Sequence, residues 1–223
     1  AVRTSPEEII VTADRRRGSE ATTAISMAVL SGDELAEKQL NSLSTVQTTV
    51  PGLTVADAGQ SNLVNIRGVG NAFTVSQVSS GVAVFSDGLF MPGTQGLNGP
   101  LFDIGSIEVL RGPQGTFVGQ SSTGGAILIY SKNPNLDGVN GFVEGTLGNY
   151  EQRKLTGAVN LPISETLAAR AAFNVEHRDS YYTNTPGAGT PGNVNNLNIR
   201  IGLLWEPSTS FRALLKFQSD RSK

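Results

Sequence analysis

The last part of the chain alternates apolar and polar residues, and this pattern limits the fold more than any other feature. Apolar residues or glycine occupy every second position in four stretches, 155–161, 167–175, 197–205 and 211–217. Successive side chains of a strand point to opposite faces of a sheet. Each stretch therefore predicts a strand with one apolar face and one polar face, and residues 138–223 are expected to form an antiparallel sheet.

A transmembrane barrel and a soluble sandwich both produce this alternation. The stretches are close to the 9–11 residues with which a tilted strand crosses a bilayer. The connections differ in length, from a short turn at 162–166 to a long loop at 183–196. Aromatic residues lie near the strand ends, where barrels carry interfacial girdles: Tyr150, Tyr181, Tyr182 and Trp205. The pattern favours a membrane barrel and leaves the sandwich as the alternative.

The middle region, residues 32–137, mixes element types. Ser31 and Asp33 offer a helix cap before residues 34–40, and Leu35, Leu40 and Leu43 can share one helical face. Short apolar runs between turn residues predict four strands, at 63–66, 82–85, 107–110 and 126–130. The 26 glycines suit a chain with many tight turns. A small compact domain of helices and strands is expected here.

Composition excludes several functions. A net charge of -2 argues against nucleic acid as a partner, because phosphate binding needs clustered cations. The chain has no cysteine, and its single histidine, His177, stands alone on an alternating stretch. No catalytic triad, metal site or cofactor site can be drawn from these residues. We therefore expect that the protein is not an enzyme and needs no cofactor.

Four blocks of the middle region resemble the plug domain of TonB-dependent outer-membrane receptors. The blocks are residues 65–70 (NIRGVG), 82–88 (VAVFSDG), 107–116 (IEVLRGPQGT) and 122–127 (STGGAI). The resemblance extends over about residues 7–223 and is most specific between 65 and 132. Gln120 and the pair Phe117 and Val118 depart from the family's usual residues, which bears on the substrate subclass.

The resemblance implies an α+β plug domain followed by antiparallel transmembrane strands of a large barrel, with about 22 strands in plugged transporters. It divides the chain into a periplasmic tail (1–31), a plug (32–137) and the first barrel strands (138–223). The roughly 85 residues after the plug suffice for about five strands, which cannot close such a barrel. The remaining strands are expected from the rest of a longer chain or from another chain.

The tail contains a segment that resembles the TonB box, through which the C-terminal domain of TonB and its inner-membrane energising complex would act. Its β-branched residues favour the extended state, and an extended segment can add to the sheet edge of a partner. The alternatives are a disordered terminus or an internal strand of the plug. The box residues are Glu8, Ile9, Ile10, Val11, Thr12 and Ala13.

The resemblance also implies two sets of site residues in the plug. Arg67, Arg111 and the neighbouring Glu108 would take part in a plug–barrel lock, since guanidinium groups bind carboxylates through paired hydrogen bonds. Loops at 71–80 and 89–99 would form an apex that holds the ligand, with aromatic and amide side chains suited to an amphiphilic molecule. The apex residues are Asn71, Phe73, Gln77, Phe90, Met91 and Gln95. Solvated arginines and ordinary loop filling are the alternatives.

The function implied is active import of a scarce small-molecule nutrient across the bacterial outer membrane, with the tail in the periplasm and outer-membrane lipid around the strands. The nutrient would be a metal–siderophore complex, cobalamin or an oligosaccharide, and the sequence does not distinguish among them. A non-transporting scaffold or assembly component of the outer membrane, which keeps the plug and a partial barrel, is the alternative function.

Overall fold

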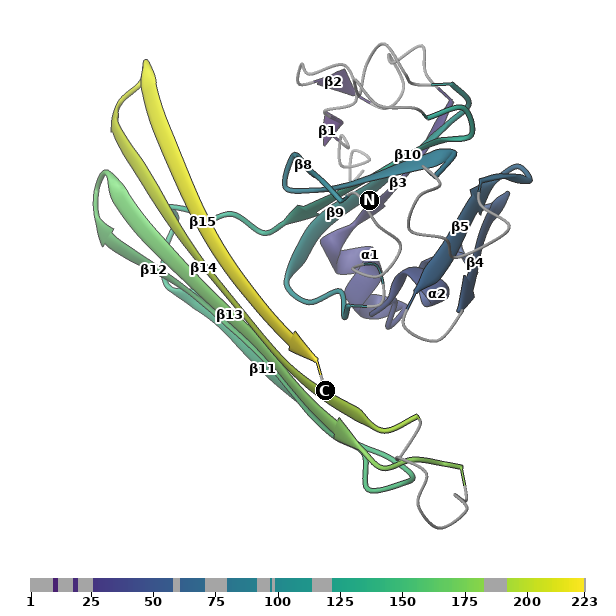
Figure 1. Ribbon diagram of the computed structural model, residues 1–223. Helices are drawn as coiled ribbons and strands as arrows, with labels where there is room; N and C mark the ends of the chain where they lie inside the picture. The colour runs from purple at the N-terminus through teal and green to yellow at the C-terminus, as the bar shows by residue number, and fades with distance from the viewer. Residues whose placement is uncertain are drawn as a thin grey trace, which may run out of the picture. The chain divides into compact units, whose positions relative to one another are not determined.

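The computed structural model describes residues 10–11, 18–19, 26–57, 61–70, 80–91, 97, 99–113, 122–182 and 192–222. The chain divides into two compact units, residues 1–132 and 133–223, whose elements are labelled in Figure 1. The domain borders expected at residues 31 and 137 remain predictions. Each unit is described by itself below.

A five-stranded mixed sheet forms the centre of the first unit, in the order β3-β9-β10-β7-β8. Its strands are β3 (Met27–Ser31), β7 (Val82–Ser86), β8 (Leu89–Phe90), β9 (Ile104–Arg111) and β10 (Gly125–Ser131). β10 pairs with β7 in parallel, and the other pairs are antiparallel. Ile107, Val109 and Ile127 pack in one core cluster, whereas Leu110 and Leu128 belong to a second cluster. Burial on both faces explains why these strands read as continuous apolar runs.

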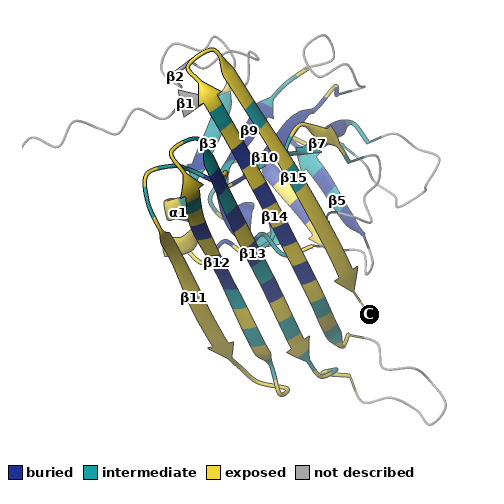
Figure 2. Cartoon of the chain, turned by 90° about the vertical axis from the view of Figure 1, so that its left-hand side faces the viewer, coloured by how far each residue is buried: buried dark blue, intermediate teal, exposed yellow. Residues whose placement is uncertain are grey.

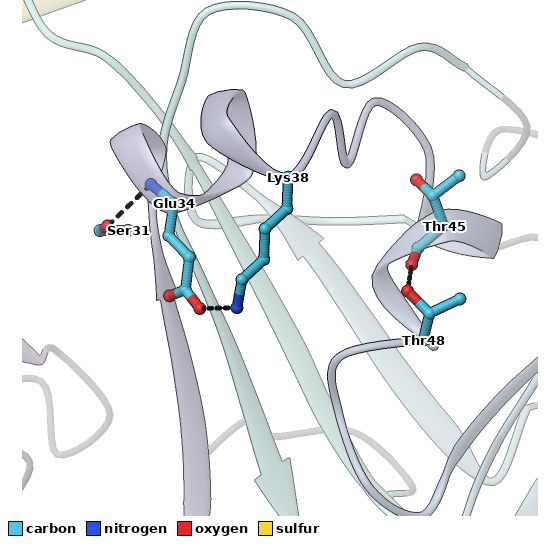
Figure 3. A network of polar contacts seen from close by, with 5 residues as sticks. All are labelled: Ser31, Glu34, Lys38, Thr45 and Thr48. Carbon is cyan, nitrogen blue, oxygen red and sulfur yellow. Dashed lines mark hydrogen bonds and ion pairs between the residues drawn. The ribbon is translucent and has the colours of Figure 1, made fainter.

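Two short helices follow β3, α1 (Gly32–Glu37) and α2 (Leu43–Val46). The Ser31 hydroxyl caps α1 by accepting a hydrogen bond from the Glu34 backbone N–H at 3.2 Å. Glu34 also pairs with Lys38 one turn later, and the Thr48 hydroxyl donates to the Thr45 carbonyl at 2.8 Å (Figure 3). Leu35, Leu40 and Leu43 are all buried. They do not share one helical face, because α1 ends at Glu37, Leu40 follows the helix and Leu43 lies on α2.

The first unit contains two further small sheets. One has three strands, β4 (Leu53–Asp57), β5 (Asn62–Ile66) and β6 (Val69–Gly70), in that order. β5 alternates buried and half-buried residues, and its buried residues Val64 and Ile66 belong to the main core cluster. The other is a two-residue pairing of β1 (Ile10–Val11) with β2 (Gly18–Ser19).

The second unit is an antiparallel sheet in which the strands follow one another in chain order. They are β11 (Asn140–Leu147), β12 (Arg153–Ser164), β13 (Leu167–Arg178), β14 (Val194–Ser208) and β15 (Phe211–Ser222). Within the described residues, β11 pairs only with β12, and β15 pairs only with β14. The sheet is therefore an open, partial barrel wall with two unpaired edges.

Burial along this sheet is the reverse of that in a soluble protein. Buried and exposed positions alternate along the middle of β12, β13 and β14 (Figure 2), and the large apolar side chains lie mostly at the exposed positions. On β14, Leu197, Ile201 and Trp205 are exposed, whereas Asn198 and Arg200 are buried. A sandwich would bury the apolar face, so this arrangement supports the membrane barrel. The expected fold class, a plug domain followed by strands of an incomplete barrel, is confirmed.

Aromatic side chains lie at both ends of the exposed apolar face. At the short-turn end, the rings of Trp205 and Phe211 meet edge to face with centroids 5.4 Å apart. At the long-loop end, Tyr181 contacts Tyr150 and Tyr182, with centroid distances of 6.1 and 4.3 Å. This distribution agrees with interfacial girdles at the two edges of an apolar band. None of the described helices has the length and apolar character needed to span a membrane.

Candidate functional site

The candidate TonB box is described only in its central two residues. Ile10 pairs with Ser19 and Val11 with Gly18, in antiparallel register. The backbone here is extended, as strand addition to a partner requires. Glu8, Ile9, Thr12 and Ala13 lie outside the described residues.

Two arginines of the expected lock meet at one serine. Arg67 is the first residue of the two-residue turn between β5 and β6, with φ at 52°. One of its terminal nitrogens lies 3.4 Å from the Ser26 hydroxyl. The Ser26 carbonyl accepts a hydrogen bond from the Arg111 backbone N–H at 2.9 Å. Ser26 thereby joins the turn after β5 to the end of β9.

The Arg111 side chain differs from that of Arg67 in its surroundings. Arg67 is exposed, while Arg111 is half-buried. Arg111 Nε is buried and has no hydrogen-bond partner among the described residues. A buried guanidinium N–H is costly without an acceptor. Arg111 is therefore the stronger candidate to bind a carboxylate that the described residues do not supply.

Glu108 lies elsewhere in the sheet. It is 1% exposed, and on β9 it stands between Val29 of β3 and Leu128 of β10. Three positions separate it from Arg111, so the two side chains leave opposite faces of the strand. Glu108 shares the face of Leu110 and is not part of the Ser26 cluster. Its expected part in a plug–barrel lock stays a prediction.

The expected ligand apex is described at two of its six residues. Phe90 on β8 is exposed, and its ring lies 5.4 Å from that of Phe85 across the hairpin. Met91 is partly buried against the core, and its backbone N–H donates to the Val84 carbonyl at 2.9 Å. Phe90 is thus the aromatic side chain available at this turn. Asn71, Phe73, Gln77 and Gln95 lie outside the described residues.

The paired glycines of the block at 122–127 serve packing. A Cβ on Gly125 would lie 2.2 Å from the Leu110 carbonyl oxygen, and Gly125 has φ at 144°. A Cβ on Gly124 would lie 2.6 Å from the Val69 carbonyl oxygen. Both contacts are with backbone, which cannot move aside cheaply. These glycines allow β10 to approach its neighbours and do not form a phosphate loop.

The polar face of the second unit carries a chain of hydrogen bonds that the sequence analysis missed. The Thr156 hydroxyl donates to Asn174 Oδ1 at 2.9 Å, and Asn174 Nδ2 donates to Asn198 Oδ1 at 3.2 Å. Asn198 Nδ2 in turn donates to Asp220 Oδ1 at 2.8 Å. The chain crosses β12 to β15, and we call these four residues the polar ladder. The available signal was an asparagine at a polar position of each of two successive strands, Asn174 on β13 and Asn198 on β14.

A second branch links Arg200 to the same carboxylate through the amide of Gln218. Arg200 Nε donates to Gln218 Oε1 at 2.8 Å, and Gln218 Nε2 donates to Asp220 Oδ2 at 2.7 Å. Both oxygens of Asp220 therefore accept a hydrogen bond. Each member of a buried polar network needs its partners, because an unsatisfied member costs more than an apolar residue would. The ladder fixes this face of the sheet as polar and ordered.

The described residues contain no group of three or more metal-binding side chains. His177, at the end of β13, lies 3.3 Å from Asp179 and 3.5 Å from Asn195, and all of these contacts are exposed. Arg178 stacks over the Tyr181 ring at 5.7 Å. These residues mark the long-loop end of the sheet.

Comparison with known proteins identifies the family. The family model described as the TonB-dependent receptor plug domain matches residues 19–126. The pesticin receptor of Yersinia pestis is 25% identical over 202 residues, which cover 86% of this chain and 29% of that receptor. An iron-regulated outer membrane virulence protein of Vibrio cholerae is 29% identical over 188 residues, which cover 78% of this chain and 28% of that protein.

A solved structure agrees with these relatives. The ferric yersiniabactin uptake receptor FyuA from Yersinia pestis matches with a TM-score of 0.74 at 25% identity, over 84% of this chain and 30% of that one. The chain spans less than a third of the length of the curated relatives that it matches. The plug match and the shared fold show that the chain contains a plug domain of the TonB-dependent receptor type followed by a partial barrel wall.

Proposed function

We propose that the whole protein imports a scarce nutrient across the bacterial outer membrane with energy delivered by TonB. The observation that carries this proposal is a receptor plug domain followed by a sheet whose apolar face is exposed and whose polar face is buried and hydrogen-bonded. Such a sheet suits lipid on one side and a polar lumen on the other. The family is one of transport receptors and not of enzymes.

Among the nutrients considered, we propose a ferric chelate. The support is that one matching structure is a ferric yersiniabactin uptake receptor and that the matching Vibrio protein is iron-regulated. Phe90 would contribute an aromatic contact at the plug apex, together with the apex residues outside the described part. An exposed ring suits the apolar part of an amphiphilic chelate.

Coupling would pass through the tail. The candidate box, residues 8–13, would add as a strand to the C-terminal domain of TonB in the periplasm. The extended backbone at Ile10 and Val11 supports this role. To reach the partner, these residues would exchange their pairing with Gly18 and Ser19 for an intermolecular one.

We further propose that Arg111 and Arg67 hold the plug against carboxylates of the barrel. The buried Nε of Arg111 and the shared contact with Ser26 support this assignment. Glu108, buried on the opposite face of β9, would act within the plug itself.

Replacement of Ile10 tests the coupling in the full-length receptor. Ile10→Pro removes a backbone N–H and fixes φ, so it should prevent strand addition and abolish uptake of a radiolabelled ferric chelate. Binding of the chelate to whole cells should be unchanged. Ile10→Val keeps the strand preference and is the matched control, with uptake like that of the parent. Normal uptake by the proline variant would show that coupling does not pass through Ile10, whereas a parent receptor that binds the chelate without importing it would favour the non-transporting scaffold.

A further inference from the structure

Residues 133–138, which we call the junction segment, connect β10 of the first unit to β11 of the second. Asn160 of β12 binds this segment through both ends of its side-chain amide. Its Nδ2 donates to the Asn135 carbonyl at 3.0 Å and to the Gly138 carbonyl at 2.9 Å, and its Oδ1 accepts from the Asn135 backbone N–H at 3.0 Å. Asn160 is fully buried. The amide satisfies backbone groups that strand pairing does not reach.

A second contact fixes the segment two strands away. Pro134 is buried against Gly202 of β14, where an added Cβ would lie 3.0 Å from Pro134 Cγ. Asn160, Arg170 and Gly202 are paired across β12, β13 and β14 in one row of the sheet. The junction segment therefore lies across a single row of the polar face. Asn160 of β12 forms one end of this row and Gly202 of β14 forms the other.

The chain is also anchored on the other side of the unit boundary. The Lys132 backbone N–H donates to the Asp103 carbonyl at 2.9 Å, and Lys132 Nζ lies 3.3 Å from Asp33 at the start of α1. Ser131, one residue earlier, bonds to Asp87. The first unit thus holds the chain up to Lys132, where that unit ends.

Only Asn133 stands between the two anchored stretches. It is exposed and makes no hydrogen bond or ion pair within the described part of the chain. The following proline restricts Asn133 to extended backbone conformations, so few torsions at this point are free to change. Any change of chain direction between the two anchored stretches must therefore occur at Asn133.

We propose that Asn160 is a positioning residue that keeps residues 134–138 on the second unit, and that movement between plug and barrel is confined to Asn133. The inference rests on the proposed transport function where it concerns movement during uptake. During that movement the junction segment would stay docked while the plug turns or is remodelled on the far side of Asn133.

Hydrogen exchange on the full-length receptor tests the anchor without any transport assay. Asn160→Ala removes the acceptor of the Asn135 N–H and should speed exchange of that amide by about tenfold or more. Asn198→Ala, on the same face but without contact to the junction segment, is the matched control and should leave the Asn135 amide unchanged. Equal exchange of that amide in parent and Asn160→Ala would overturn the proposal.

A reversible cross-link tests the confinement to Asn133. The 223 residues contain no cysteine, so Asn135→Cys with Asn160→Cys introduces one defined thiol pair in this part of the receptor. The two thiols are joined by a short disulfide-containing linker. Uptake by the joined variant should stay within about twofold of uptake by the unjoined variant. Loss of uptake that returns on reduction would show that the segment must leave the sheet, and would overturn the proposal. If the parent imports no chelate, the transport function fails, while the exchange experiment still decides on the anchor.

Discussion

Asp87 accepts two hydrogen bonds from Ser131, one from the backbone N–H at 3.0 Å and one from the hydroxyl at 2.6 Å. Asp87 and Gly88 form the two-residue turn between β7 and β8, with φ at 47° and 82°. Such turns with positive φ at both residues match the twist of a hairpin. Ser131 is the last residue of the neighbouring strand β10. The Asp87 side chain therefore connects the turn beside Phe90 to the end of β10, just before the junction segment.

Replacement of Asp87 should therefore loosen two places at once. Asp87→Ala removes both acceptor oxygens and leaves the Ser131 N–H without its partner, at a cost of about 1–3 kcal/mol in local stability. Asp87→Asn keeps an acceptor and tolerates positive φ, so its cost should be smaller. Hydrogen exchange at Ser131 in the full-length receptor measures the difference. Equal exchange in the two variants would show that the carboxylate does not hold β10.

The polar ladder should contribute to the stability of the barrel wall. Asn174→Ala breaks the bonds to Thr156 and Asn198 at a fully buried position, and should cost about 1–3 kcal/mol. Asn196→Ala is the matched control on the same face of β14, because Asn196 makes no side-chain hydrogen bond within the described residues. Thermal unfolding of the purified receptor in detergent compares the two. A melting temperature lowered equally by both would argue against a specific role of the ladder.

The exposed apolar face should respond to charge according to depth. Ile201 lies in the middle of the apolar row of β14, and Leu197 lies toward its long-loop end. Arginine at the bilayer midplane of a barrel costs about 2–4 kcal/mol, and about 0–1 kcal/mol near the interface. Ile201→Arg should thus impair folding into lipid vesicles far more than Leu197→Arg. Similar folding yields for the two variants would contradict a lipid-facing role of this row.

The sequence was most informative where one physical rule dominates. β12 to β15 were predicted because alternation follows directly from strand geometry, and Leu197 and Asn198 remain on opposite faces in the structure. The alternation could not tell which face is buried, since a sandwich and a barrel differ only in what surrounds the sheet. The burial of Asn198 and the exposure of Leu197 supplied that answer.

Among the strands that escaped prediction, β3 and β11 did so for different reasons. β3, Met27–Ser31, was assigned to a polar tail, because it follows unpatterned polar sequence and no turn residues mark its start. Its position next to β9 is a long-range pairing that no local pattern encodes. β11, Asn140–Leu147, contains two glycines and a glutamate and is exposed along its whole length. β11 forms because its residues pair with the edge of β12, and this pairing cannot be recognised from the local sequence of β11.

The candidate site was predictable by residue type but not by arrangement. Arg67 and Arg111 were singled out, yet Ser26, which brings their segments together, carries no mark in the sequence. Asn160 was visible only as a polar position on an alternating strand. Its role depends on the path of residues 134–138 over the sheet, and that path is set by Pro134 and Gly202 through shape.

The row formed by Asn160, Arg170 and Gly202 has a consequence for the order of folding. Its members come from three successive strands, so the surface that receives Pro134 and Asn135 is complete only after β14 has paired with β13. Before that pairing, Asn135 can bind Asn160, but Pro134 has no Gly202 to pack against. Docking of residues 134–138 on the sheet is therefore completed later than the hairpin of β12 and β13, and a chain arrested before β14 would lack the contact of Pro134 with Gly202.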